Sequence, residues 1–145
     1  MQVQGGGSAG GKGRKEDIAR VFIDKFLEEL PEQFFLLEIT SRVLEYTPYV
    51  VVVLQECERM NMLLWEIKVS LTDLDEGLKG QLNITDAMEA LSTALSINKV
   101  PANWESKVYF SLKTLADWFQ NLKARVTNYK NGLERLKYLS LFISS

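Results

Sequence analysis

The hydrophobic positions between residues 47 and 80 repeat with the period of an α-helix. Apolar side chains recur in alternating steps of three and four residues, which places them along one side of a single long helix. These positions are Val50, Val53, Cys57, Met60, Leu64, Ile67, Leu71, Leu74 and Leu78. The composition of Tyr49–Leu54 would also suit a buried strand, but the unbroken spacing favours a helix from Tyr49 to about Lys79. A stripe of this length must pack against other helices.

Shorter helical patterns lie on both sides of this segment. The first runs from Lys15 to Leu30 and stops at Pro31. Its predicted buried face consists of Ile18, Val21, Phe22, Phe26, Leu27 and Leu30. A second short helix is expected over Leu36–Tyr46, and the dipeptide Thr47-Pro48 starts the long helix.

Two further helices are expected after Gly80, which is a plausible C-terminal cap of the long helix. Thr85 is a suitable N-cap for a helix over Asp86–Ile97. A last helix follows Trp104 and is expected to end at Asn131-Gly132. Its stripe is Leu112, Leu115, Phe119, Leu122, Val126 and Tyr129.

These elements predict an all-α fold, an antiparallel helical array around one long central helix. Residues 1–14 hold most of the glycines of the sequence and are expected to form a flexible linker. Residues 15–132 form the helical part, and residues 133–145 form a C-terminal tail of different character.

Composition removes several classes of chemistry. The sequence has no histidine and one cysteine, Cys57, so His-based catalytic triads, His-containing zinc sites and an intrachain disulfide are excluded. Cys57 lies on the apolar stripe and is expected to be buried and unreactive. The longest apolar run has six residues, so we expect no membrane span and an intracellular, soluble protein. Net charge is −2, but residues 1–100 carry −6 and residues 101–145 carry +4.

Three motif-like patterns fail on inspection. Gly6–Gly13 nearly matches a phosphate-binding loop, but Gly13 replaces the required Ser or Thr and no strand precedes it. Asp73–Gly77 lacks the spacing and the final Glu of a calcium loop. Trp65, Trp104 and Trp118 have no interleaved basic stripe, which argues against nucleic acid. We therefore expect no catalytic residues, no cofactor and no metal site.

Six stretches in a fixed order resemble the C-terminal domain of axonemal dynein heavy chains, nearest the outer-arm β type. They are GGGSAGGKGR, LEELPEQF, TPYVVVVLQECERMN, SLTDLDEGLKGQLNIT, MEALSTALSINKVPANW and YFSLKTLADWFQNL. The resemblance runs from about Gly5 to Gly132. After it, GLERLKYLSLFISS departs from the family's aromatic continuation, which suggests a truncated or fragmentary product.

The resemblance implies a piece of a microtubule minus-end-directed ATPase motor in the cytoplasm, the cytoskeleton and the ciliary axoneme. This piece would be non-catalytic, would lie across the AAA+ ring and would modulate coupling. Its partners would be the ring, the remainder of the heavy chain and other dynein subunits, with no membrane or nucleic acid. The candidate interface residues on the long helix are Tyr49, Gln55, Arg59, Asn61 and Trp65.

Two other hypotheses remain open. A free-standing helical adaptor could bind an acidic partner, such as tubulin tails or lipid, through its basic C-terminal helix. The residues concerned are Lys123, Arg125, Lys130, Arg135 and Lys137. An ATPase is the least favoured alternative.

Overall fold

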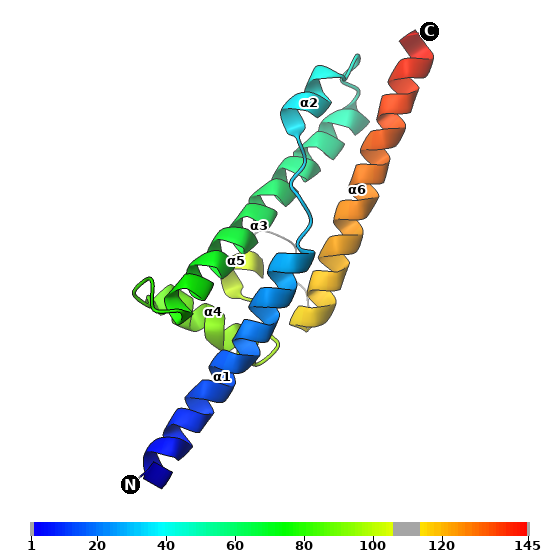
Figure 1. Cartoon of the computed structure of the whole chain (residues 1–145). Helices are drawn as coiled ribbons and strands as arrows, with labels where there is room; N and C mark the ends of the chain where they lie inside the picture. The colour runs from blue at the N-terminus through cyan, green and yellow to red at the C-terminus, as the bar shows by residue number, and fades with distance from the viewer. Residues whose placement is uncertain (1, 106–113, 145) are drawn as a thin grey trace.

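The computed structural model describes residues 2–105 and 114–144, with side chains described for residues 13–105 and 114–135. This part of the protein is helical and contains no strand, so the prediction of an all-α fold is confirmed (Figure 1). The helices are α1 (Gln2–Glu29), α2 (Leu36–Ser41), α3 (Pro48–Leu78), α4 (Asp86–Ser96), α5 (Ala102–Glu105) and α6 (Leu115–Ser144).

Helix α3 begins and ends at the signals that the sequence predicts. The Thr47 hydroxyl accepts a hydrogen bond from the Val50 amide at 3.2 Å, and Pro48 occupies the first turn. At the other end Gly80 has a φ of +81°, a conformation that side chains disfavour. The Gly80 amide donates to the Gly77 carbonyl, and the Gln81 amide donates to the Glu76 carbonyl. These two bonds form a Schellman cap, which satisfies carbonyls that a helix end leaves unpaired.

The predicted stripe of α3 forms the centre of the core. Its buried residues are Val50, Cys57, Met60, Leu63, Leu64, Ile67, Leu71, Leu74 and Gly77. Val53 and Leu78 are partly buried against the same core. A Cβ atom at Gly77 would lie 2.7 Å from Ile84 Cδ1, at the end of a side chain in the loop that packs back on the helix, so a larger residue would require the Ile84 side chain to shift.

The other helices pack around α3, which contacts each of them (Figure 1). In Figure 1, α1 and α6 run in the direction opposite to α3, and α4 crosses near its C-terminal end. An aromatic cluster joins α1, α5 and α6. Phe26 stacks on Phe119 with ring centres 4.0 Å apart, and Trp104 stacks on Trp118 at 5.9 Å. The Trp104 indole also donates a hydrogen bond to the Ser70 hydroxyl at 3.0 Å, which fixes α5 on α3.

Asn98 connects the end of α4 to the start of α6. Its φ of +56° allows a second Schellman cap, in which the Asn98 and Lys99 amides donate to the Leu95 and Ala94 carbonyls. Its side-chain oxygen accepts from the Ala116 amide at 3.1 Å, and its carbonyl accepts from the Leu115 amide at 3.0 Å. Asn98 therefore ends α4 and caps the start of α6.

The buried face of α1 differs partly from the prediction. Phe26 is buried, and Phe22, Leu27 and Leu30 are partly buried, as predicted. Val21 is 67 % exposed, whereas Ala19 and Ile23 are fully buried. The Arg20 guanidinium donates a hydrogen bond to the Leu78 carbonyl, at the end of α3, at 3.1 Å. The face is therefore rotated relative to the prediction, because α1 packs against both α3 and α4.

The helix bounds differ from two expectations about the ends of the molecule. Residues 1–14 were expected to be a flexible linker, yet α1 begins at Gln2. Asn131-Gly132 was expected to end the last helix, yet α6 continues to Ser144. Leu133, just beyond the glycine, packs against the core and supports this continuation. The predicted stripe position Leu112 lies outside the described residues.

Candidate functional site

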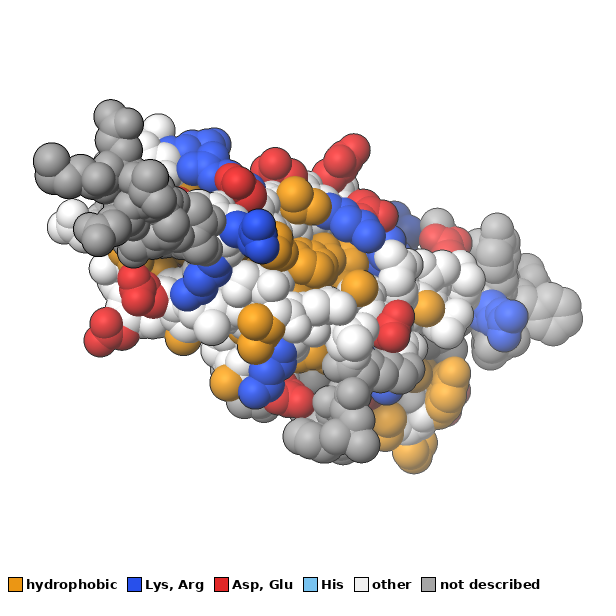
Figure 2. Space-filling model, turned by 90° about the horizontal axis from the view of Figure 1, so that it is seen from below, with side chains coloured by type: hydrophobic (Ala, Val, Ile, Leu, Met, Phe, Trp, Pro, Cys, Tyr) orange, Lys and Arg blue, Asp and Glu red, His pale blue; other side chains and the backbone are white. Residues whose placement is uncertain are grey.

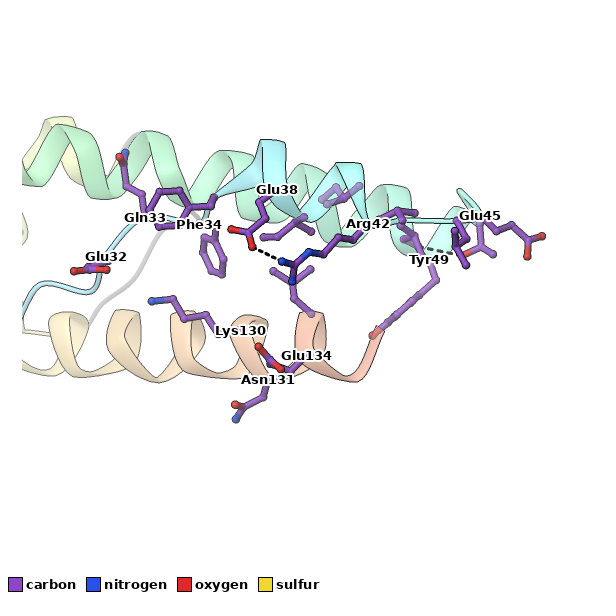
Figure 3. A pocket seen from close by; sticks show the side chains of 18 residues that line it. Glu32, Gln33, Phe34, Glu38, Arg42, Glu45, Tyr49, Lys130, Asn131 and Glu134 are labelled. Atoms are coloured by element: carbon purple, nitrogen blue, oxygen red, sulfur yellow. Dashed lines mark hydrogen bonds and ion pairs between the residues drawn. The ribbon is translucent and has the colours of Figure 1, made fainter. Parts of the chain in front are cut away.

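The five candidate interface residues of α3 lie on different sides of the helix. Gln55, Arg59 and Trp65 are exposed and lie on the side away from the buried stripe. Tyr49 lies at the first turn and points across a cleft toward α6 (Figure 3). Asn61 lies on the flank of α3 that contacts the segment between α1 and α2. The structure therefore divides them among an outer face, a cleft and an internal contact.

The outer face of α3 carries large apolar side chains that remain exposed in the structure. Met62 and Trp65 are 56 % and 58 % exposed, and Val51 and Val52 are also exposed. Arg59 forms an ion pair with Glu56 at 3.4 Å on the same helix. The sequence-based selection missed Met62, although it lies three residues before Trp65, at the spacing that puts two side chains on one helical face.

Exposed apolar side chains are not confined to α3. Figure 2 shows hydrophobic side chains gathered in a patch on the face seen from below, with basic and acidic side chains around it. The other two tryptophans are not part of such a surface. Trp104 is fully buried and Trp118 is 6 % exposed, so Trp65 is the tryptophan available for contact.

Asn61 holds the α1–α2 connection against α3. Its side-chain oxygen accepts from the Phe34 amide at 2.7 Å, and its side-chain nitrogen donates to the Phe34 carbonyl at 2.9 Å. The Gln33 side chain adds a bond to the Asn61 carbonyl at 2.9 Å. Both polar groups of Phe34 are thus satisfied while its ring is buried. The hydrogen-bonding capacity of Asn61 is used inside the molecule.

A cleft of about 860 Å³ lies between α2 with its flanking segments, the first turns of α3 and the C-terminal half of α6 (Figure 3). Its apolar lining residues are Phe34, Phe35, Ile39, Val43, Leu44, Tyr49, Val50, Leu54 and Leu133. Phe35, Leu44 and Tyr49 are each about two-thirds exposed or more. Such side chains mark interaction surfaces when they gather in one place.

The charged residues of the cleft are mainly acidic. Among its described lining residues are Glu32, Glu38, Glu45 and Glu134, against Arg42 and Lys130. Glu38 and Arg42 form an ion pair at 2.7 Å. The Lys130 ammonium lies 5.8 Å from the centre of the Phe34 ring, a cation–π contact.

The basic residues of α6 are partly engaged within the molecule. Lys123 forms an ion pair with Glu29 at 3.0 Å and lies 5.5 Å from the centre of the Phe119 ring. Lys130 contacts Phe34, while Arg125 and Arg135 are exposed. The side chain of Lys137 lies outside the described residues. The adaptor hypothesis needs a continuous basic surface on α6, and two of its proposed residues, Lys123 and Lys130, already have partners within the molecule.

Cys57 is fully buried in the core, as predicted. Burial, assisted by the negative charge of Glu56, raises the pKa of its thiol from 9.0 to about 11. Because the thiolate is the reactive form, this thiol is a poor nucleophile in the folded protein.

Two kinds of feature, metal-binding clusters and membrane-spanning helices, are absent from the part of the molecule that the structure describes. Its residues hold no group of three or more His, Cys, Asp or Glu side chains arranged to bind a metal ion. None of the helices in this part combines the length and apolar character needed to cross a membrane. The geometry thus draws attention to two protein surfaces, the outer face of α3 and the cleft.

Comparison with known proteins assigns the family. The sequence matches the family described as the C-terminal domain of the dynein heavy chain over residues 1–142. The chain belongs to this family. The family named from the resemblance of the six stretches is therefore confirmed.

The relatives of this dynein segment are ciliary, flagellar and axonemal heavy chains. The ciliary dynein beta chain of Tripneustes gratilla is 50 % identical over 112 residues, which make up 77 % of this chain. Dynein axonemal heavy chain 17 of Homo sapiens is 44 % identical over 127 residues, or 87 % of this chain. The flagellar outer arm dynein beta chain of Chlamydomonas reinhardtii is 41 % identical over 129 residues, or 86 % of this chain. The chain spans 2–3 % of the length of these relatives.

Proposed function

We propose that this dynein segment is a non-catalytic helical module of an axonemal heavy chain, which packs on the AAA+ ring and modulates motor activity. It would act in the cytoskeleton of cilia and flagella, within the dynein complex. The family and the ciliary, flagellar and axonemal relatives support this location. The segment's contribution would be made by contact with the rest of the heavy chain and not by chemistry of its own.

The row of exposed apolar side chains on the outer face of α3 carries this proposal. Met62 and Trp65 lie opposite a stripe that the other helices already cover. A surface helix normally places polar side chains on its outer face, because contact between apolar surface and water is unfavourable. Tryptophan and methionine are enriched at protein interfaces, where tryptophans often carry much of the binding energy. Gln55 and Arg59 would then form the polar rim of the same contact.

Binding of the 145-residue chain to a purified dynein AAA+ ring that lacks this segment tests the proposal. We expect the double variant Met62→Glu/Trp65→Glu to weaken binding by about 30-fold or more, because the anchor side chains are lost. The matched control is Val21→Glu/Leu37→Glu, which changes two apolar residues that are 67 % and 89 % exposed on other helices. Equal loss of binding in both variants would contradict a specific role of the α3 outer face.

Two functional assays complete the test. A full heavy chain with Met62→Glu/Trp65→Glu should show altered microtubule-stimulated ATPase activity and gliding velocity, while the control variant behaves as the parent. The 145-residue chain alone should release no phosphate from ATP above the buffer background. Hydrolysis by the purified protein would contradict the non-catalytic role.

A further inference from the structure

We infer that the cleft between α2, α3 and α6 is a docking groove for a basic amphipathic helix of a separate protein partner. This groove is distinct from the outer face of α3 and does not depend on the function proposed for that face. The inference rests on three features of the cleft: its walls, its apolar lining and the charge at its rim.

The walls have the arrangement that a third helix would complete. One wall is α2 with residues 32–35, the other is the part of α6 around Lys130–Glu134, and the first turns of α3 form the floor (Figure 3). Helices that pack together lie about 8–10 Å apart, and a groove between two of them accepts the apolar face of another. The volume of about 860 Å³ is large enough to take several apolar side chains at once.

The apolar residues of this region are unusually exposed. More than half of the large exposed apolar side chains that the structure describes fall between residues 35 and 52. Of these, Phe35, Leu44 and Tyr49 line the cleft and are 72 %, 66 % and 66 % exposed. Covering them would remove apolar area from water, which is the main favourable term in helix docking.

The charge at the rim selects the occupant. The ion pair between Glu38 and Arg42 neutralises both of those side chains. Among the described residues, no ion pair involves the three remaining carboxylates, on Glu32, Glu45 and Glu134. Apart from Arg42, Lys130 is the basic residue among the described residues that line the cleft. A helix with an apolar face and basic flanks complements this rim, whereas a second copy of the protein would bring the same acidic rim with it.

A designed peptide pair tests the inference on the 145-residue chain. The probe is a fluorescein-labelled amphipathic helix of about five turns with a leucine face and lysine flanks, and its comparison replaces every lysine with glutamate. We expect fluorescence anisotropy to show binding of the lysine peptide and at least roughly tenfold weaker binding of the glutamate peptide. Equal binding of the two peptides would overturn the inference.

Matched variants locate the binding. Glu32→Gln/Glu45→Gln/Glu134→Gln removes the three unpaired rim carboxylates and should weaken binding of the lysine peptide by roughly tenfold. Glu28→Gln/Glu58→Gln/Glu89→Gln makes the same net charge change at exposed positions outside the cleft and should leave binding unchanged. Leu44→Glu should also weaken binding, and because Leu44 is exposed the helical circular dichroism should be retained. Loss of binding in the outside variant to the same extent would overturn the inference.

Light scattering on the protein without peptide tests whether a second copy of the protein fills the groove. A monomer is expected. A dimer that dissociates in the Leu44→Glu variant would mean that a second copy fills the groove, and would overturn the assignment to a separate partner. Binding of a small apolar dye in the groove without competition from the lysine peptide would likewise overturn it.

Discussion

Asn61 offers the sharpest test of how this protein is held together, because its side chain bonds to Phe34, 27 residues earlier in the sequence. The substitution Asn61→Ala removes two hydrogen bonds, of 2.7 Å and 2.9 Å. It leaves the Phe34 amide without its partner, while the Phe34 carbonyl keeps the bond that it accepts from the Leu36 amide at 3.1 Å. At about 1 kcal/mol for each bond, the expected destabilisation is about 2 kcal/mol. It would be larger if the buried Phe34 ring also left the core.

Thermal unfolding followed by circular dichroism measures this effect. For a protein of 145 residues, about 2 kcal/mol corresponds to a lowering of Tm by about 6 °C. The variant Asn61→Asp keeps the acceptor for the Phe34 amide but faces the Phe34 carbonyl with a second oxygen, so it should show at least half of the destabilisation. Hydrogen exchange at the Phe34 amide should accelerate in both variants, because that amide loses its partner or its geometry.

The control is Gln55→Ala, an exposed position on the same helix, which should change the free energy of unfolding by less than about 0.5 kcal/mol. If Asn61 served only as a contact for another protein, its removal would leave the stability of the isolated segment unchanged. An Asn61→Ala variant with the Tm of the parent would therefore refute the role of Asn61 in holding the α1–α2 connection on α3.

Three further predictions concern helix ends and the core. Asn98→Ala should lower the free energy of unfolding, measured by chemical denaturation, by about 2 kcal/mol, because alanine disfavours the left-handed backbone and the bond to Ala116 is lost. Asn98→Gly should lower it by about 1 kcal/mol, because glycine accepts a φ of +56° and only the bond is lost. Equal losses in the two variants would contradict a contribution from the backbone conformation. Gly80→Ala should cost about 1 kcal/mol by the same measurement, and since nothing lies within 4 Å of its added Cβ, a larger loss would contradict a purely conformational cause. For Cys57, the raised pKa means that the folded protein disfavours the thiolate. The contribution of the neutral thiol to the free energy of unfolding is therefore fully present below pH 9.0 and is lost as the pH rises to about 11. Over this range the parent should lose about 2–3 kcal/mol more than a Cys57→Ala variant, and parallel stability curves of the two proteins would contradict it.

The sequence by itself determined helix α3 and its two ends. The 3–4 spacing from Val50 to Leu78 specifies which side chains share a face, and that face is buried. Thr47 and Gly80 act through bonds to residues a few positions away, and Pro48 acts through its fixed φ, so their effects are local and can be read from the sequence. The burial of Cys57 follows from the same periodicity, because the stripe passes through it. The family was likewise readable from short stretches in a fixed order.

Only the tertiary structure decided what lies against each face and what remains open. Val21 is exposed and Ile23 buried because α1 packs between two helices, and periodicity alone does not say which neighbours an apolar face meets. Asn61 has the same appearance in the sequence as the exposed Gln55, but its partner lies 27 residues away. The continuation of α6 past Gly132 and the cleft beside it likewise depend on segments distant in sequence. A local pattern records the shape of one helix, whereas contacts between helices arise only when folding brings distant segments together.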